Sequence, residues 1–282
     1  MKHDLIATDL SVRLGGTTVL DSVSMHARAG QVTGLIGPNG AGKSTLLAAL
    51  SGDLSLSSGS VRIGELDPSR ATARQLSRHR AVMLQDTHVA FSFLVRDVVE
   101  MGRHPWSAKE KGKDEELLID AALAATGVGH LAGRDVMTLS GGERSRVALS
   151  RVLAQQTPVV LLDEPTAAMD IRHQEQSLGL MRQLAAAGVA VVVVLHDLNA
   201  AATYCDEIVM LSRGRVAAAG PVEAVYTEEI LSEVYRWPIQ VFRDPRGLTQ
   251  VTPQHGGGQD QASGQLADLI GGKWRKSLLP LS

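Results

Sequence analysis

The chain has 282 residues, of which 44% are hydrophobic, and it carries 28 basic against 30 acidic residues, a net charge of −2. This length and apolar content suit one large domain with a well-buried core and room for a subdomain. The balanced charge argues against a nucleic-acid partner, which normally shows as a basic excess or a basic stripe.

Three further features bear on where the protein works. The single cysteine, Cys205, cannot form an internal disulfide, so we expect a reducing compartment. Asp4 and Asp9 interrupt the apolar core that a signal peptide needs, so no secretion is indicated. The longest apolar run, Val189–Leu195, is far shorter than the roughly 20 residues of a membrane-spanning helix, so we do not expect the chain to cross a bilayer by itself.

The beginning of the chain predicts antiparallel strands with one face in water. Leu10, Val12 and Leu14 alternate with polar neighbours, residues 19–25 form a second extended segment, and residues 61–63 read as a further strand of the same sheet.

A glycine-rich segment follows the apolar run 32–36 and leads into the apolar helix-like run 46–50. It fits the phosphate-binding pattern GxxxxGK[ST], with a strand before it and a helix after it. Its residues are Gly37, Pro38, Asn39, Gly40, Ala41, Gly42, Lys43, Ser44 and Thr45. The glycines let backbone N–H groups turn inward around an anion, and the helix points its positive end at phosphate. We expect Lys43 to contact the β- and γ-phosphates and the Ser44 hydroxyl to bind Mg²⁺.

Between about Leu76 and Gln155 the strand signals thin out and helical spacing takes over. Leu117, Ala121 and Ala124 share one face of a segment that ends at Gly127. We interpret residues 86–157 as a helical subdomain inserted into an α/β core.

The second half of the chain predicts the rest of that core. Residues 159–162 and 189–195 are continuous apolar runs, which are typical of parallel strands buried on both faces. A hairpin around Gly214 and a short helix from Thr227 to Tyr235 come after the core. From Pro253 the composition changes to Gly, Gln and Ser, so we expect a domain over 1–252 and a flexible tail over 253–282.

Two strand ends carry polar side chains that suit phosphate chemistry. Asp163 and Glu164 end one core strand, where Asp163 fits a carboxylate that organises Mg²⁺ and Glu164 fits the group that polarises a water. His196 ends the next core strand and would face the γ-phosphate at the same edge of the sheet.

The segment from Leu139 to Arg144 predicts a helix start with an unusual second property. Ser140 and Glu143 form a capping box. Capping does not explain Gly141 and Gly142, each of which costs roughly 1 kcal/mol near a helix. Bare backbone N–H groups at a helix N-terminus are instead suited to bind an anion.

With these motifs, the chain up to about residue 252 resembles the ATP-binding subunit of an ABC transporter. The matching motifs are Gly37–Thr45 (Walker A), Gln85 (Q-loop), Leu139–Glu143 (signature), Val159–Glu164 (Walker B with its catalytic glutamate), Asp170 (D-loop) and His196 (H-switch). The resemblance implies an α/β fold: a P-loop NTPase core with a parallel sheet, an N-terminal antiparallel β subdomain and an inserted α-helical subdomain.

The resemblance also implies the workings of the site. ATP and Mg²⁺ would be the cofactors, with Glu164, His196 and Gln85 at the catalytic centre and Ser44, Gln85 and Asp163 near the metal. In that family the signature of one subunit covers the ATP held by its partner, so Ser140, Gly141, Gly142 and Asp170 imply a head-to-tail homodimer. Where many members place an aromatic side chain on the adenine, this chain has Leu14.

The segment around Gln85, from Arg80 to Pro105, is similar to importers of iron chelates, cobalamin and haem, and within them most like the haemin importers. This implies two permease subunits, a substrate-binding protein and a peripheral place on the cytoplasmic face of the cell membrane. Ferric siderophore and cobalamin are the alternative cargoes. A soluble ABC ATPase without a permease would usually carry two nucleotide modules or a long coiled-coil insertion. A P-loop kinase or GTPase would have no reason to keep the signature and His196.

Overall fold

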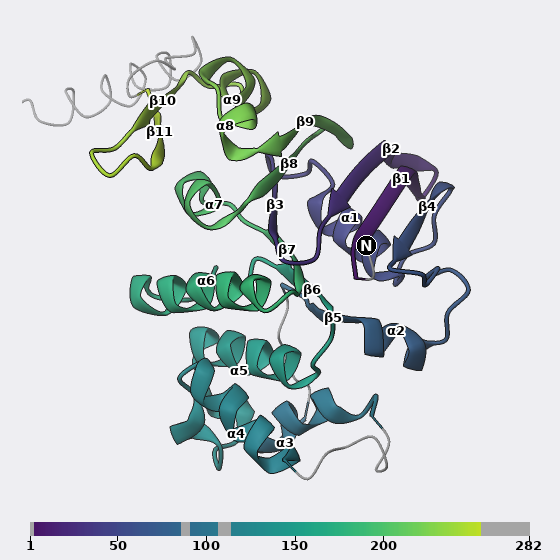
Figure 1. Cartoon of the computed structure of the whole chain (residues 1–282), viewed down its shortest axis with the longest axis vertical. Coiled ribbons are helices and arrows are strands. Elements are labelled where there is room, and N and C mark those ends of the chain that lie inside the picture. Colours follow the sequence, from purple (N-terminus) through teal and green to yellow (C-terminus); the bar gives the residue numbers. More distant parts are fainter. Residues whose placement is uncertain (1–2, 86–90, 107–113, 255–282) are drawn as a thin grey trace, which may run out of the picture.

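The computed structural model describes residues 3–85, 91–106 and 114–254 (Figure 1). Its centre is a six-stranded sheet with the strand order β5-β6-β7-β3-β8-β9. The strands are β3 (Val32–Ile36), β5 (Arg80–Met83), β6 (Val159–Asp163), β7 (Ala190–Val194), β8 (Glu207–Ser212) and β9 (Arg215–Pro221). Neighbouring strands run parallel except for β8 and β9, which are antiparallel. Every residue of β3, β6 and β7 is buried, as their continuous apolar sequences predict.

One face of this sheet packs against α1 (Lys43–Ser51) and a separate antiparallel sheet. That second sheet has the order β2-β1-β4 and consists of β1 (Leu5–Leu14), β2 (Thr17–Ala27) and β4 (Ser58–Ile63). Leu46 and Leu50 of α1 share a buried apolar cluster with both sheets. The phosphate-loop helix is therefore held between two sheets.

The opposite face of the central sheet is covered by helices and by the last described part of the chain. These elements are α6 (Ile171–Ala186), α7 (Leu198–Tyr204), α8 (Val222–Val225), α9 (Glu228–Tyr235) and the hairpin β10 (Ile239–Arg243)–β11 (Thr249–Pro253). Thr227 caps α9, as predicted, because its side chain accepts the Ile230 N–H.

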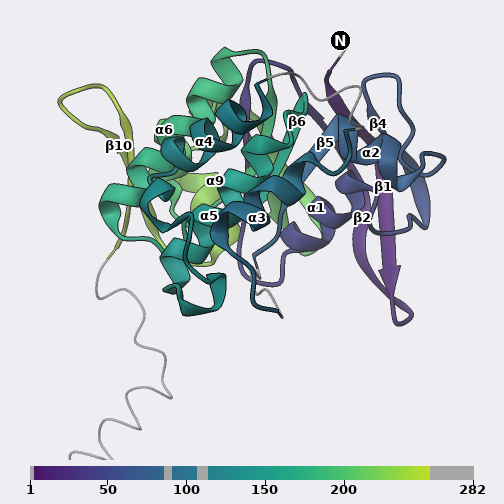
Figure 2. The same ribbon diagram turned by 90° about the horizontal axis from the view of Figure 1, so that it is seen from below.

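Three further α-helices, with the 3₁₀ turns between them, form a group that has a hydrophobic cluster of its own and is set apart from the antiparallel sheet (Figures 1 and 2). It contains α3 (Val95–Glu100), α4 (Glu115–Ala125), α5 (Gly141–Ala154) and the 3₁₀ turns η1 (Met101–Arg103), η2 (Gly129–Leu131) and η3 (Val136–Thr138). Val147 of α5 belongs to this cluster, whereas Leu149 and Val152 pack on the central sheet. The helix α5 thus joins the helical group to the core.

The predicted helix is present as α4, but the face that carries Leu117, Ala121 and Ala124 is not the buried one. Ile119, Ala122 and Leu123 are its buried residues, while Leu117 is 67% exposed and Ala121 and Ala124 are also exposed. Both faces offer apolar residues at helical spacing, so periodicity alone does not tell which one meets α3 and α5.

The positions of two strands, β5 and β8, also differ from what the sequence predicts. Helical spacing was expected to begin at about Leu76, but α2 (Ala73–His79) ends at His79 and β5 follows as an edge strand of the central sheet. The predicted hairpin around Gly214 is present as β8 and β9, but it belongs to the core, because β8 also pairs in parallel with β3.

At the C-terminus, β11 runs through Pro253, and the tail expected from there lies outside the described residues beyond 254. Among the helices in the described ranges, none has the length and apolar character needed to cross a membrane.

Candidate nucleotide site

The loop between β3 and α1 has the backbone of a phosphate cradle. Gly37 adopts φ 143° and Gly42, the residue that precedes α1, adopts φ 102°. A Cβ at Gly37 would lie 2.2 Å from the Leu211 carbonyl oxygen, and a Cβ at Gly42 would lie 2.8 Å from Leu20. Only glycine fits these two positions, and no side chain caps the helix that follows. The first N–H groups of α1 are therefore oriented by backbone alone.

Lys43 is held against this loop. Its ammonium group donates to the carbonyl oxygens of Gly37 at 2.8 Å and Pro38 at 3.0 Å, and the residue is buried. Burial lowers the pKa of Lys43, while the nearby Glu164 and Asp163 carboxylates act in the opposite direction. A positive charge thus lies between the loop and two carboxylates.

Asp163 ends β6 with a carboxylate that is nearly closed off from solvent. Burial raises its pKa, and a hydrogen bond from Ser44 opposes that shift. Its Oδ1 is buried and has no hydrogen-bond partner among the described residues. A buried carboxylate oxygen with a free lone pair beside a serine hydroxyl is a donor set that suits a divalent cation.

Glu164 is the centre of a second cluster. It adopts φ 49°, an uncommon conformation for a residue other than glycine. Its Oε2 accepts a hydrogen bond of 2.9 Å from the Gln85 amide, and its Oε1 pairs with Nε2 of His196. These three side chains come from the ends of β5, β6 and β7, which are adjacent in the sheet. The parallel order of the strands therefore brings all three to one edge.

Ser140, Gly142 and Asp170 are placed differently. Ser140 caps α5 and forms the full capping box with Glu143, and that contact lowers the pKa of Glu143. A Cβ at Gly142 would lie 2.7 Å from the Ala168 carbonyl oxygen. Asp170 caps α6 through the His173 N–H at 3.0 Å. Within the described residues, no hydrogen bond or ion pair joins these residues to the phosphate loop or to Glu164.

One contact with the phosphate loop has no signal in the sequence. Tyr235, at the end of α9, lies beside the Gly37 backbone, which lowers the pKa of its hydroxyl, although burial dominates and raises that pKa to about 12. A tyrosine that ends a helix almost 200 residues away has no local feature that points to this loop.

A phosphate loop between a buried strand and a helix, with carboxylates at the end of a neighbouring strand, defines the P-loop nucleoside triphosphatases. The ABC transporter family model matches residues 20–167. The chain belongs to the ABC transporter family, and it is an ATPase subunit that binds and hydrolyses ATP.

Individual relatives are similar over most of the chain. It is 51% identical over 248 residues to the hemin import ATP-binding protein HmuV of Streptomyces coelicolor, which covers 88% of this chain and 89% of that protein. It is 45% identical over 251 residues to the cobalamin import ATP-binding protein BtuD of Halobacterium salinarum, covering 88% of this chain and 63% of that protein. Among solved structures, cbiO1 from Clostridium perfringens, part of the ABC transporter complex cbiONQ, is 30% identical with a TM-score of 0.70 over 83% of this chain and 94% of that chain. The predicted fold class is confirmed.

Proposed function

We propose that this chain powers the import of haem across the cytoplasmic membrane, as the ATP-hydrolysing subunit of an ABC importer. The observation that carries the proposal is the Gln85–Glu164–His196 cluster beside the phosphate loop, together with 51% identity to a hemin import protein. The alternatives, ferric siderophore and cobalamin, keep the same subunit role, and the cobalamin importer relative favours the second of them.

In this proposal the phosphate loop holds the nucleotide. Backbone N–H groups of residues 37–45 would surround the phosphates, and Lys43 would exchange its two loop carbonyls for phosphate oxygens. Leu14 is 43% exposed at the end of β1 and would offer the adenine an apolar contact in place of an aromatic one.

The residues around Asp163 fit Mg²⁺. The Ser44 hydroxyl, the unpartnered Asp163 oxygen and the Gln85 amide oxygen would hold it with the phosphates. No cluster of three or more His, Cys, Asp or Glu suited to a metal occurs in the described part of the chain. When bound, Mg²⁺ offsets negative charge on the phosphates.

Glu164 would act as the general base. Its carboxylate accepts a proton from the attacking water, whose oxygen forms the new bond to the γ-phosphorus while the bond to the β–γ bridging oxygen breaks, giving ADP and phosphate. The Gln85 amide and the His196 ring each contact one oxygen of the Glu164 carboxylate, and these two contacts orient the carboxylate. His196 is 46% exposed, so it is free to face a γ-phosphate.

We infer that the site is completed by a second copy of the chain. In the described residues, no hydrogen bond or ion pair joins Ser140, Gly141, Gly142 or Asp170 to the phosphate loop of their own chain, and the chain carries one set of motifs. In a head-to-tail homodimer they would approach the γ-phosphate bound to the partner. Importer ATPases of this family work as dimers with membrane permease subunits.

The surface next to Gln85 supports a permease contact. Leu84, Phe91 and Leu94 are 57%, 71% and 46% exposed and flank the segment after β5. Large apolar side chains that stay exposed to water at several positions are consistent with a protein interface. We propose two permease subunits and, through them, a substrate-binding protein, with this chain peripheral on the cytoplasmic face and without a nucleic-acid partner.

The test is ATP hydrolysis by the subunit assembled with its permease and binding protein. Haem-loaded binding protein should stimulate hydrolysis, whereas ferric siderophore or cobalamin should not. If only cobalamin or only ferric siderophore stimulates hydrolysis, that molecule is the cargo instead of haem. A lack of stimulation by all three would reject the importer role.

A further inference from the structure

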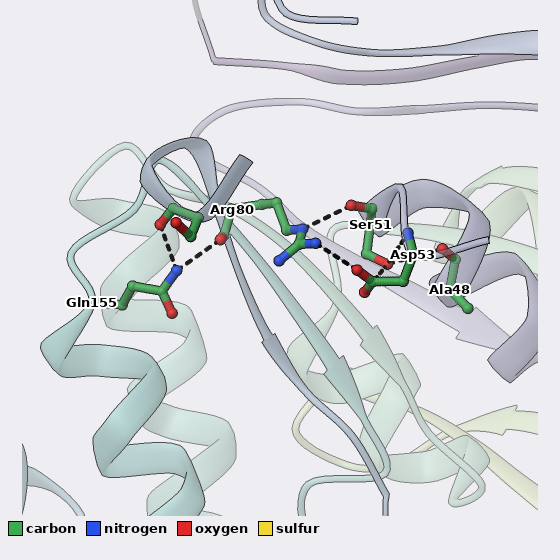
Figure 3. A network of polar contacts seen from close by, with 6 residues as sticks. Ala48, Ser51, Asp53, Arg80 and Gln155 are labelled. Carbon is green, nitrogen blue, oxygen red and sulfur yellow. Dashed lines mark hydrogen bonds and ion pairs between the residues drawn. The ribbon is translucent and has the colours of Figure 1, made fainter. Parts of the chain in front are cut away.

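A partly buried polar network lies around Arg80, at the end of β5 opposite Gln85 (Figure 3), and the Asp53 side chain in it is 53% exposed. The Arg80 side chain is only 13% exposed. Its Nε donates to the Ser51 carbonyl oxygen at 2.8 Å, and its Nη2 donates to Asp53 Oδ1 at 2.8 Å. The Ser51 hydroxyl in turn contacts Asp53 Oδ2 at 2.6 Å, and the Asp53 N–H donates to the Ala48 carbonyl at 3.0 Å. The guanidinium group thus binds the last residue of α1, Ser51, and Asp53 just beyond the helix.

The backbone of Arg80 is held from the other side. The Gln155 side-chain amide donates to the carbonyl oxygens of Arg80 at 2.9 Å and Ser77 at 2.5 Å (Figure 3). Gln155 caps the end of α5, and its own carbonyl accepts the indole N–H of Trp106 at 2.9 Å. We call Ser51, Asp53, Arg80 and Gln155 the Arg80 network.

Each element that meets in this network carries a site residue at its other end. The helix α1 begins at Lys43 and ends at Ser51, and the helix α5 begins after Ser140 and ends before Gln155. The strand β5 begins at Arg80, and Gln85 lies two residues beyond its end. Helices and strands are stiff, so an element that is held in place at the Arg80 network also has a fixed orientation at its other end, where the site residue lies.

We propose that Arg80 is a positioning residue for ATP hydrolysis: its side chain fixes the end of α1 against the start of β5, so that Gln85 beyond the other end of β5 is correctly oriented, while the Arg80 backbone carbonyl holds Gln155 at the end of α5. Arginine suits this position because its planar fork reaches a carbonyl and a carboxylate at once, whereas a lysine ammonium is a single point charge. The inference rests on the proposed roles of Gln85 and Glu164.

The experiment measures kcat, KM and the Kd for MgATP of the full chain carrying Arg80→Ala. We expect kcat to fall about tenfold or more, since small misplacements of catalytic groups have large effects. The Kd of the monomer for MgATP should stay within about twofold, because the two sheets that pack on α1 still hold Lys43 and Ser44 in place. Arg80→Lys keeps the charge but loses the fork, and its kcat should lie between those of wild type and Arg80→Ala. An unchanged kcat in Arg80→Ala, or full activity in Arg80→Lys, would overturn the inference.

A matched control separates positioning from general damage. Leu76→Ala removes a buried apolar side chain of α2 next to the network without touching its hydrogen bonds. Arg80 also lines an open groove of about 1350 Å³, so a guanidinium ion can reach the space that the truncated side chain leaves. Guanidinium at low millimolar concentration should restore part of kcat in Arg80→Ala and none in Leu76→Ala. If both variants lose the same kcat and neither responds, Arg80 is merely structural.

Glu164→Gln, measured in parallel, keeps the two proposals distinguishable. Loss of hydrolysis in Glu164→Gln with normal hydrolysis in Arg80→Ala rejects only the positioning role. Normal hydrolysis in Glu164→Gln rejects the proposed catalytic site on which that role rests.

Discussion

At the scale of single residues, the geometry centres on Glu164, whose left-handed backbone and two side-chain contacts leave it little freedom. A residue other than glycine in this conformation costs of order 1 kcal/mol, which the surrounding structure must offset. Such strain beside a buried carboxylate and a lysine is typical of a catalytic position.

Glu164→Gln should lower ATP turnover by about 10² to 10⁴, the range that general-base catalysis contributes, because an amide cannot accept the proton of water. Binding of MgATP should persist, since Lys43, Ser44 and Asp163 are unchanged. Steady-state hydrolysis and equilibrium binding of a fluorescent ATP analogue measure the two effects. Equal losses of binding and turnover would contradict the assignment.

Asp163→Asn should separate stability from metal binding. The pKa of Asp163 is raised by burial, so the unfolded chain gives up this proton more readily, and above the unfolded pKa the ionised carboxylate lowers folding stability. The neutral variant should therefore have a higher Tm than wild type at pH 7 without nucleotide. It should also lose most of the Tm increase that MgATP gives wild type, because an oxygen for the cation becomes a neutral amide group.

A differential scanning fluorimetry titration from pH 5 to pH 8 checks this sign. The stability advantage of Asp163→Asn over wild type should shrink as the pH falls through the raised pKa, where Asp163 becomes neutral as well. A wild type that is more stable than the variant without nucleotide across the whole range would contradict the role of burial.

The residues that could be predicted from the sequence are those at the ends of recognisable strands. Asp163, Glu164 and His196 follow continuous apolar runs, so their shared edge follows from a parallel sheet. Gln85 was identified through the family resemblance, because the short strand before it gives a weak signal. The contact from Tyr235 to Gly37 and the pairing of Arg80 with Asp53 join distant segments, and neither spacing nor propensity indicates them.

At the scale of elements, the segment from α8 to β11 holds the helix that follows His196. The Asn199 side chain accepts a hydrogen bond from the Val251 N–H at 2.7 Å and donates one to the Val251 carbonyl at 3.2 Å. It thus satisfies both backbone groups of Val251, as a neighbouring β-strand would. The Tyr226 hydroxyl donates to the Leu198 carbonyl at 2.9 Å. The end of the described chain is therefore part of the support of the nucleotide site.

Asn199→Ala should lower the free energy of unfolding by about 1 to 3 kcal/mol, since the Val251 N–H loses its partner in a half-buried place. Urea denaturation followed by circular dichroism measures this change. Asn199→Asp keeps an acceptor for the N–H but loses the donor, so its loss should be smaller. A loss in Asn199→Asp as large as in Asn199→Ala would show that the acceptor contact is unimportant.

Element types were predicted better than their environments. The capping box of Ser140, the N-cap of Thr227 and the continuous apolar runs are local signals, and they correctly indicated α5, α9, β6 and β7. The buried face of α4 and the place of β8 depend on which neighbours pack there, and the local sequence does not contain that information.

At the scale of the whole molecule, one chain supplies half of the proposed site. Lys43 and Glu164 lie at one edge of the central sheet, whereas Ser140 forms its capping-box hydrogen bonds with Glu143, within the first turn of α5. A second copy would place its α5 start over the bound γ-phosphate, where exposed N–H groups and the helix dipole favour negative charge.

Ser140→Ala should reduce hydrolysis while leaving the affinity of the isolated monomer for MgATP nearly unchanged. The substitution also removes a helix cap and should lower stability by about 1 kcal/mol, so Thr227→Ala, which removes the cap of α9, is the matched control. Hydrolysis should fall in the first variant and not in the second. A similar loss of monomer affinity in Ser140→Ala would contradict a role in the partner's site.

The most direct test of the central claim, an ATP site shared by two copies, is the mass of Glu164→Gln in solution with and without MgATP. Sedimentation should give the 29.9 kDa of one chain without nucleotide and twice that mass with it, because the variant binds ATP and cannot hydrolyse it. Adding Ser140→Ala should return the mass toward one chain. A Glu164→Gln protein that stays at 29.9 kDa while saturated with MgATP would contradict the account.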